Sequence, residues 1–125
     1  MSIIPEFLIK RIYKKGSLRP TDDGIAFDLK NVLGPGVISG LNFVKINDMV
    51  FESNLVKFIT QGIETIASVI SEENPIAFRL GQEGTLKLLT DGKILQDGLN
   101  QITIELSNPE AGIVRVDLCD HYQAA

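Results

Sequence analysis

The side chains best suited to chemistry in this chain of 125 residues lie together near its C-terminal end, in the run Leu118-Cys119-Asp120-His121-Tyr122. This run holds the single cysteine and the single histidine of the sequence. A thiolate beside an imidazole could act as a nucleophile, and Cys, His and Asp side chains can together ligate a metal ion. If the last strand continues through the run, Cys119 and His121 point to the same face, but no second Cys or His completes a zinc site. We therefore expect Cys119 at an edge or half-buried position, and His121 as a tail residue or as a contact that reaches into a partner's active site.

Two pairs of neighbouring acids and one glycine-rich loop are the next candidates. Asp22-Asp23 and Glu72-Glu73 could supply an acid and a base, but catalysis needs one carboxyl whose pKa is raised by burial. Acids in Gly-, Asn- and Pro-rich segments are usually solvated and serve turn formation. The segment Gly34-Pro35-Gly36 lacks the Lys-Ser/Thr pair of a phosphate loop, so we expect a tight connection there.

The loop Gly16-Ser17-Leu18-Arg19-Pro20 could face another protein, because an arginine can hold a carboxylate of a second chain. An ordinary surface loop is the alternative. The sequence thus assigns no catalytic, cofactor-binding or metal-binding residue to this chain. Its candidate partner contacts are Ser17, Arg19 and His121.

Charge and hydropathy exclude several classes of function. The formal net charge of −4 argues against a nucleic-acid partner, which would require a basic surface. Lys10, Arg11, Lys14 and Lys15 form the densest basic cluster, and we expect it on a solvated edge strand whose alternation splits it between two faces. No apolar run approaches the roughly 20 residues that cross a membrane, and no signal-peptide pattern is visible. With a single cysteine, these features predict a cytoplasmic protein with no membrane partner.

The elements that position these residues follow a period of two, with one apolar and one polar face, as in antiparallel strands that pack on one side. Clear alternation covers residues 25–30, 76–80, 102–106 and 114–118. Turn residues separate the strands, and Asp91-Gly92 is the strongest hairpin signal among them. Further turns are expected at 22–24, 47–48 and 108–112.

Residues 54–71 permit two interpretations. Leu55, Ile59, Ile63, Ile66 and Ile70 fall at helical spacing, so an amphipathic helix could begin at residue 53 or 54. An internal glycine at position 62 and many β-branched residues favour instead two strands, 55–60 and 63–69. Short strands at regular spacing predict an all-β fold: one domain over 1–125, an antiparallel β-sandwich or jelly roll, with a short helix around 54–71 as the open alternative.

A set of turn and strand residues adds a family resemblance. It comprises residues 7–15, Gly16-Ser17-Leu18, the segments 22–27 and 29–31, Asn74-Pro75, and the turn at 97–102. With these residues the chain resembles the small β subunit of bacterial C-glycoside deglycosidases.

The resemblance implies an accessory β-sandwich that pairs with a larger TIM-barrel α subunit in a hetero-oligomer. That α subunit would hold a divalent metal, manganese, and all catalytic residues, so this chain would bind no cofactor. The complex would cleave the carbon–carbon bond between a 3-keto sugar and an aromatic, flavonoid-type aglycone. From the residues alone, a stand-alone carbohydrate-binding jelly roll is the alternative function, and a small enzyme that uses Cys119 or His121 is a third.

Overall fold

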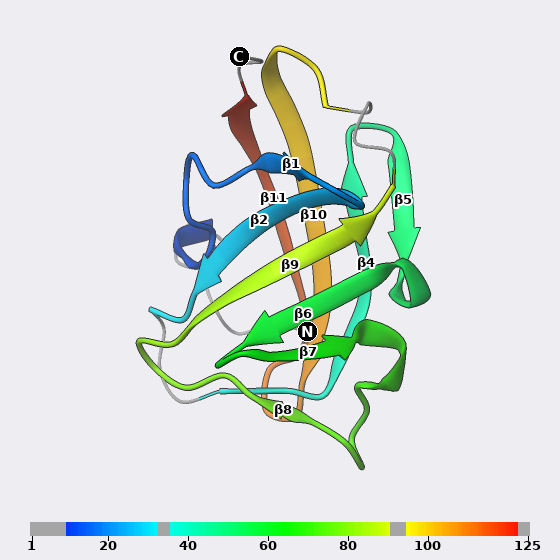
Figure 1. Ribbon diagram of the computed structural model, residues 1–125. Helices are drawn as coiled ribbons and strands as arrows, with labels where there is room; N and C mark the ends of the chain where they lie inside the picture. Colours follow the sequence, from blue (N-terminus) through cyan, green and yellow to red (C-terminus); the bar gives the residue numbers. More distant parts are fainter. Residues whose placement is uncertain (1–9, 33–35, 91–94, 123–125) are drawn as a thin grey trace.

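The chain folds into two stacked antiparallel sheets, shown in a computed structural model that describes residues 10–32, 36–90 and 95–122 (Figure 1). The larger sheet has the strand order β1-β2-β9-β6-β7, with bounds Arg19–Thr21, Gly24–Lys30, Glu83–Leu89, Val56–Thr60 and Ile63–Ile66. The second sheet has the order β11-β10-β4-β5, with bounds Gly112–Tyr122, Gly98–Asn108, Gly40–Ile46 and Met49–Glu52. A small pair joins β3 (Val37–Ile38) to β8 (Ile76–Ala77). The predicted all-β sandwich is therefore confirmed.

The core lies between the two sheets and follows from the alternation in the sequence. In β9, for example, Leu86 and Leu88 are fully buried, whereas Thr85 and Lys87, which alternate with them, face the other side. Opposite them, β10 contributes Ile102 and Ile104. Burial of these aliphatic side chains is the main force that holds the sheets together, at roughly 25 cal/mol per Å² of apolar surface removed from water.

The segment 54–71 forms strands, so the alternative of a short helix is wrong. Strands β6 and β7 pair as a hairpin, and the turn between them has positive φ at Gln61 (52°) and Gly62 (76°). Two consecutive residues with positive φ match the twist of a tight hairpin and interrupt any helix. Only two short 3₁₀ turns accompany the hairpin among the described residues, η2 (Ser53–Leu55) and η3 (Ala67–Val69).

Other turn predictions have mixed outcomes. The hairpins at 47–48 and 108–112 are confirmed, since β4 pairs with β5 and β10 pairs with β11. The expected strand at 76–80 is shorter, because pairing ends at Ala77 and the chain turns at Gly81 with φ at 87°. The Asp91-Gly92 turn lies outside the described residues, as do Gly34 and Pro35.

The basic segment near the N-terminus is not an edge strand. Residues Lys10–Ile12 form the 3₁₀ turn η1, and only Tyr13 joins a strand, through a single bridge to Leu29. The buried Tyr13 ring packs on Phe27 with 5.4 Å between ring centroids. The burial of Tyr13 against the core has a larger effect on the conformation of this segment than the alternation of its charged residues. In the part of the chain that the structure describes, no helix has the length and apolarity to cross a membrane.

Candidate functional site

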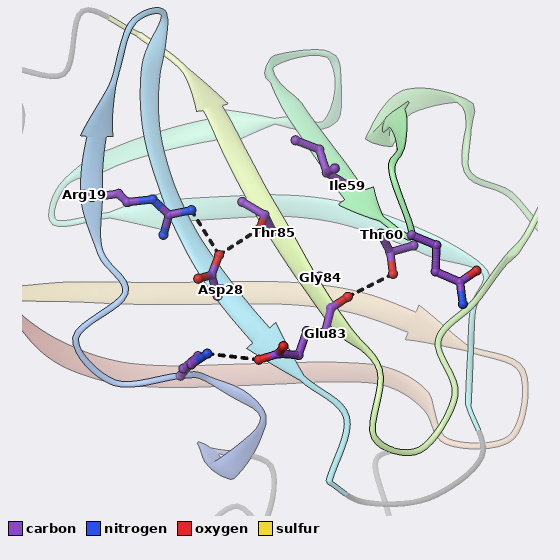
Figure 2. A pocket seen from close by; sticks show the side chains of 9 residues that line it. Arg19, Asp28, Ile59, Thr60, Glu83, Gly84 and Thr85 are labelled. Carbon is purple, nitrogen blue, oxygen red and sulfur yellow. Dashed lines mark hydrogen bonds and ion pairs between the residues drawn. The ribbon is translucent and has the colours of Figure 1, made fainter.

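A shallow depression of about 230 Å³ lies on the outer face of the five-stranded sheet (Figure 2). Strand alternation explains its polar character, because the even-numbered residues of β9 turn inward and the odd-numbered ones turn outward. No aromatic side chain lines it, unlike the stacking platform of a sugar-binding groove. Its lining consists of Lys14, Arg19, Asp28, Ile59, Thr60, Gln61, Glu83, Gly84 and Thr85.

The charged groups of the depression neutralise one another. Arg19 Nη2 lies 3.2 Å from Asp28 Oδ1, and that same oxygen accepts a 2.8 Å hydrogen bond from the Thr85 hydroxyl (Figure 2). Lys14 Nζ lies 3.0 Å from Glu83 Oε1. The hydrogen bond to Glu83 and the charge of that carboxylate raise the pKa of Lys14. Two cations thus face two anions, and the depression offers no net charge to an ionic ligand.

Arg19, one of the candidate partner contacts, lines this depression, and Ser17, a second one, lies next to it. The backbone N–H of Asp28 donates to Ser17 Oγ over 2.9 Å, and Arg19 Nη1 donates to the Ser17 carbonyl over 2.7 Å. Both side chains therefore stabilise the loop before β1 within their own chain. A contact to another protein would have to be made in addition to these bonds.

His121, the third candidate, lies on the other sheet. It is exposed on the outer face of β11, where it pairs with Leu99 of β10. Cys119 is also exposed on this face, as the alternation of the last strand predicts, and its thiol is free. The structure therefore separates His121 from Ser17 and Arg19, and the three residues do not form one site.

Asp120, between Cys119 and His121, is the buried polar residue that matters most. Its Oδ2 accepts a 2.6 Å hydrogen bond from the Tyr13 hydroxyl and a 3.0 Å bond from the Gly16 N–H. Its Oδ1 accepts a 2.9 Å bond from the N–H of His121. The alternation at 114–118, extended by two residues, places Asp120 on the core face and could have identified it.

The pair of Tyr13 and Asp120 is structural. Burial raises the pKa of the Tyr13 phenol far above its usual range, and the neighbouring Asp120 carboxylate adds to this effect. The phenol therefore stays protonated at neutral pH and donates its hydrogen bond to the carboxylate.

A second buried polar residue, Asn100, holds the start of β10. Its side chain is fully buried, and its Oδ1 accepts hydrogen bonds from Asn47 Nδ2 and from the Gln96 N–H, each 3.0 Å long. Sequence analysis placed this residue only in a turn. Within residues 10–32, 36–90 and 95–122, no group of three or more His, Cys, Asp or Glu side chains is arranged to hold a metal ion.

Comparison with known proteins corrects the family that turn residues suggested. No curated protein matches the chain. The family model that matches is that of the hydroxymethylglutaryl-CoA reductase N-terminal domain, over residues 8–123. This match overturns the resemblance to the small β subunit of C-glycoside deglycosidases and the function in flavonoid glycoside cleavage that it implied, because turn residues and strand hydrophobics recur in unrelated sandwiches. Since the match covers nearly the whole sequence, the chain belongs to the hydroxymethylglutaryl-CoA reductase N-terminal domain family.

Proposed function

We propose that this chain is a non-catalytic accessory domain of a hydroxymethylglutaryl-CoA reductase, and that it binds the catalytic part of that enzyme. The family match and the self-neutralised depression support this proposal. The partner is then the reductase's catalytic part, in place of the barrel subunit with its manganese. The catalytic part would also hold any cofactor, since this domain contributes structure and binding surface.

The observation that carries the proposal is a set of exposed aliphatic residues at the β7 edge of the five-stranded sheet, which we name the β7 surface. Its members are exposed although aliphatic: Ile63 by 65%, Val69 by 53%, Ile66 by 42% and Leu55 by 38%. They come from β7 and from the 3₁₀ turns η2 and η3 (Figure 1). The turn η2 contacts β7, η3 and the edge strand β5. Exposed aliphatic groups gathered at one edge of a sheet are a common feature of protein interfaces.

The surroundings of the β7 surface suit a protein partner. Lys57 of β6 pairs with Glu64 at 3.5 Å, so polar and charged groups border the apolar residues. An apolar centre with a polar rim is the common anatomy of an interface. We further infer a cytoplasmic location, which the exposed free thiol of Cys119 supports, because such thiols persist in reducing compartments.

The experiment mixes the chain with the catalytic polypeptide of the reductase from the same source and measures affinity by isothermal titration calorimetry. We expect Ile66→Asp and Val69→Asp each to raise the dissociation constant about tenfold or more, because they place a charge in an apolar contact. Leu80→Asp is the matched control, since Leu80 is also exposed, on the loop after β8. Equal affinity for all variants would contradict binding through this surface.

A second measurement tests the non-catalytic role. The chain alone is incubated with hydroxymethylglutaryl-CoA and a reduced nicotinamide cofactor, and cofactor oxidation is followed by absorbance. We expect no oxidation above the buffer rate. Turnover by the isolated chain would overturn the proposal.

A further inference from the structure

We propose that two copies of this chain associate edge to edge through β11, which joins their four-stranded sheets into one continuous antiparallel sheet. This inference does not depend on the proposed function. The strands β11 and β5 are the two opposite edges of the four-stranded sheet, so a β11 contact leaves the β7 surface, beside β5, free for a different partner.

Strand β11 is an unusually long edge strand, and the 3₁₀ turn η1 also contacts it. The strand has 11 residues and, among the described strands, pairs only with β10. Edge strands normally avoid association by being short, by carrying Pro or charged side chains, or by being covered by another element. The segment from Ile113 to Cys119 contains no Pro or Lys, and its two charged residues, Arg115 and Asp117, have opposite signs.

The pattern of side chains on β11 is complementary to itself in one register. When two β11 strands run antiparallel with Val116 facing Val116 of the second copy, Arg115 of each copy faces Asp117 of the other. The two-fold axis doubles this contact, and opposite charges directly across a pair of strands stabilise it. In the present chain Arg115 Nε lies 3.4 Å from Asp117 Oδ2, and the Thr103 hydroxyl donates a 2.6 Å hydrogen bond to Asp117 Oδ1. Both charged side chains are more than half exposed, so a second copy can reach them.

The other residues of β11 agree with the same register. Val114 faces Leu118 of the second copy on the core side, and Ile113 faces Cys119 on the outer side, so apolar groups meet apolar groups. Moving the axis to Asp117 places Asp117 opposite itself, and moving it to Arg115 places Arg115 opposite itself. Like charges opposite each other destabilise a strand pair, so charge selects the register centred on Val116.

Hydrogen bonds from the N-terminal loop to β11 limit how far the contact between two copies can extend along this strand. The Gly16 N–H and the Tyr13 hydroxyl bind the Asp120 carboxylate near the end of β11. The register uses residues 113–119, which lie before Asp120, and the second strand pairs alongside the turn η1.

The first test is sedimentation equilibrium of the full chain at increasing concentration, which we expect to show a monomer–dimer equilibrium. Arg115→Asp sets two acids opposite two acids and should raise the dissociation constant about tenfold or more. Asp117→Arg sets arginine opposite arginine and should raise the dissociation constant by a similar factor. The double variant R115D/D117R restores opposite charges and should recover the dimer, which a merely structural effect of either residue would not produce.

The second test uses the native Cys119 as a reporter. The Ile113→Cys variant should form a disulfide-linked dimer on mild oxidation, seen on a non-reducing gel, because positions 113 and 119 face each other across the axis. Within one strand these positions lie roughly 20 Å apart, too far for a disulfide. Position 113 is 56% exposed, so the substitution leaves the core unchanged.

Wild-type chain and the double variant I113C/C119S are the controls, and neither should cross-link. A chain that stays monomeric at all concentrations overturns the proposal. A dimer that is unaffected by R115D, or that cross-links equally in the controls, overturns it as well.

Discussion

At the scale of single residues, the contact between Tyr13 and Asp120 joins the two ends of the chain. The two residues are separated by 107 positions, and the phenol donates a 2.6 Å hydrogen bond to the carboxylate in a buried environment. A buried carboxylate is costly unless every oxygen is satisfied, and here backbone N–H groups of Gly16 and His121 complete its bonding. The residue therefore stabilises the sandwich, although its neighbours in sequence first suggested chemistry.

We predict that Tyr13→Phe lowers the free energy of unfolding by about 1–3 kcal/mol at neutral pH, because it removes a hydrogen bond to a charged group. Because the folded phenol has a raised pKa, it keeps its proton when the unfolded chain loses it. Wild-type stability should then fall as the pH rises above about 10, and the variant should lack this part of the loss. Urea denaturation at pH 7 and above pH 10 measures both effects.

The matched control is Tyr122→Phe, which alters a half-buried tyrosine two residues from Asp120 on β11. If both variants showed the same stability and the same dependence on pH, the role assigned to the Tyr13 hydroxyl would be wrong.

At the scale of elements, a glycine in β9 makes room for a core ring from the neighbouring strand β6. Gly84 pairs with Thr60 of β6 and with Leu29 of β2, at a point where the fully buried ring of Phe58 lies against the backbone. A Cβ atom at position 84 would lie 2.6 Å from two atoms of that ring. The ring also packs edge-on against Phe78, at 5.4 Å between centroids, so it has little room to move.

We predict that Gly84→Ala destabilises the fold by about 1–3 kcal/mol, the usual cost of overpacking a core. Gly40→Ala in β4 is the control, because its nearest contact is 3.3 Å, to the Ser107 side chain. Thermal denaturation of both variants measures the difference. A smaller loss for Gly84→Ala than for Gly40→Ala would contradict this account of the packing.

At the scale of the whole molecule, the net negative charge and the pairing of surface cations with carboxylates disfavour anionic ligands. The formal net charge is −4, and the cations beside the depression are held by carboxylates. A second pair on the same sheet, Lys87 with Asp23 at 2.9 Å, lowers the pKa of Asp23 through its hydrogen bond and charge. Anionic ligands such as nucleic acids or the phosphates of coenzyme A would have to break these pairs.

We therefore predict no saturable binding of coenzyme A or of inorganic phosphate to the wild-type chain at millimolar concentration, measured by calorimetry. The double variant Asp28→Asn with Glu83→Gln frees Arg19 and Lys14 and should bind phosphate weakly, in the millimolar range. Tight binding to the wild-type chain would show that the paired charges do not control access.

The sequence by itself determined the class of fold and most strand positions. Its alternation and its turns at Gln61-Gly62, Asn47-Asp48 and 108–112 act locally, through backbone torsion and side-chain direction. The same local signals could not identify the family, because turn residues and alternating hydrophobics are shared by unrelated sandwiches. They also failed at Lys10–Ile12, where contact with distant residues outweighs local pattern.

Only the tertiary structure decided which distant side chains meet. It brought Tyr13 to Asp120, paired Arg19 with Asp28 and placed His121 on the opposite sheet, and none of these follows from spacing along the chain. Strand order and the stacking of the two sheets set these distances, and both depend on the burial of the whole core rather than on any single segment. For this reason Cys119 and His121, which first suggested chemistry, are exposed side chains on either side of Asp120, a buried carboxylate that stabilises the fold.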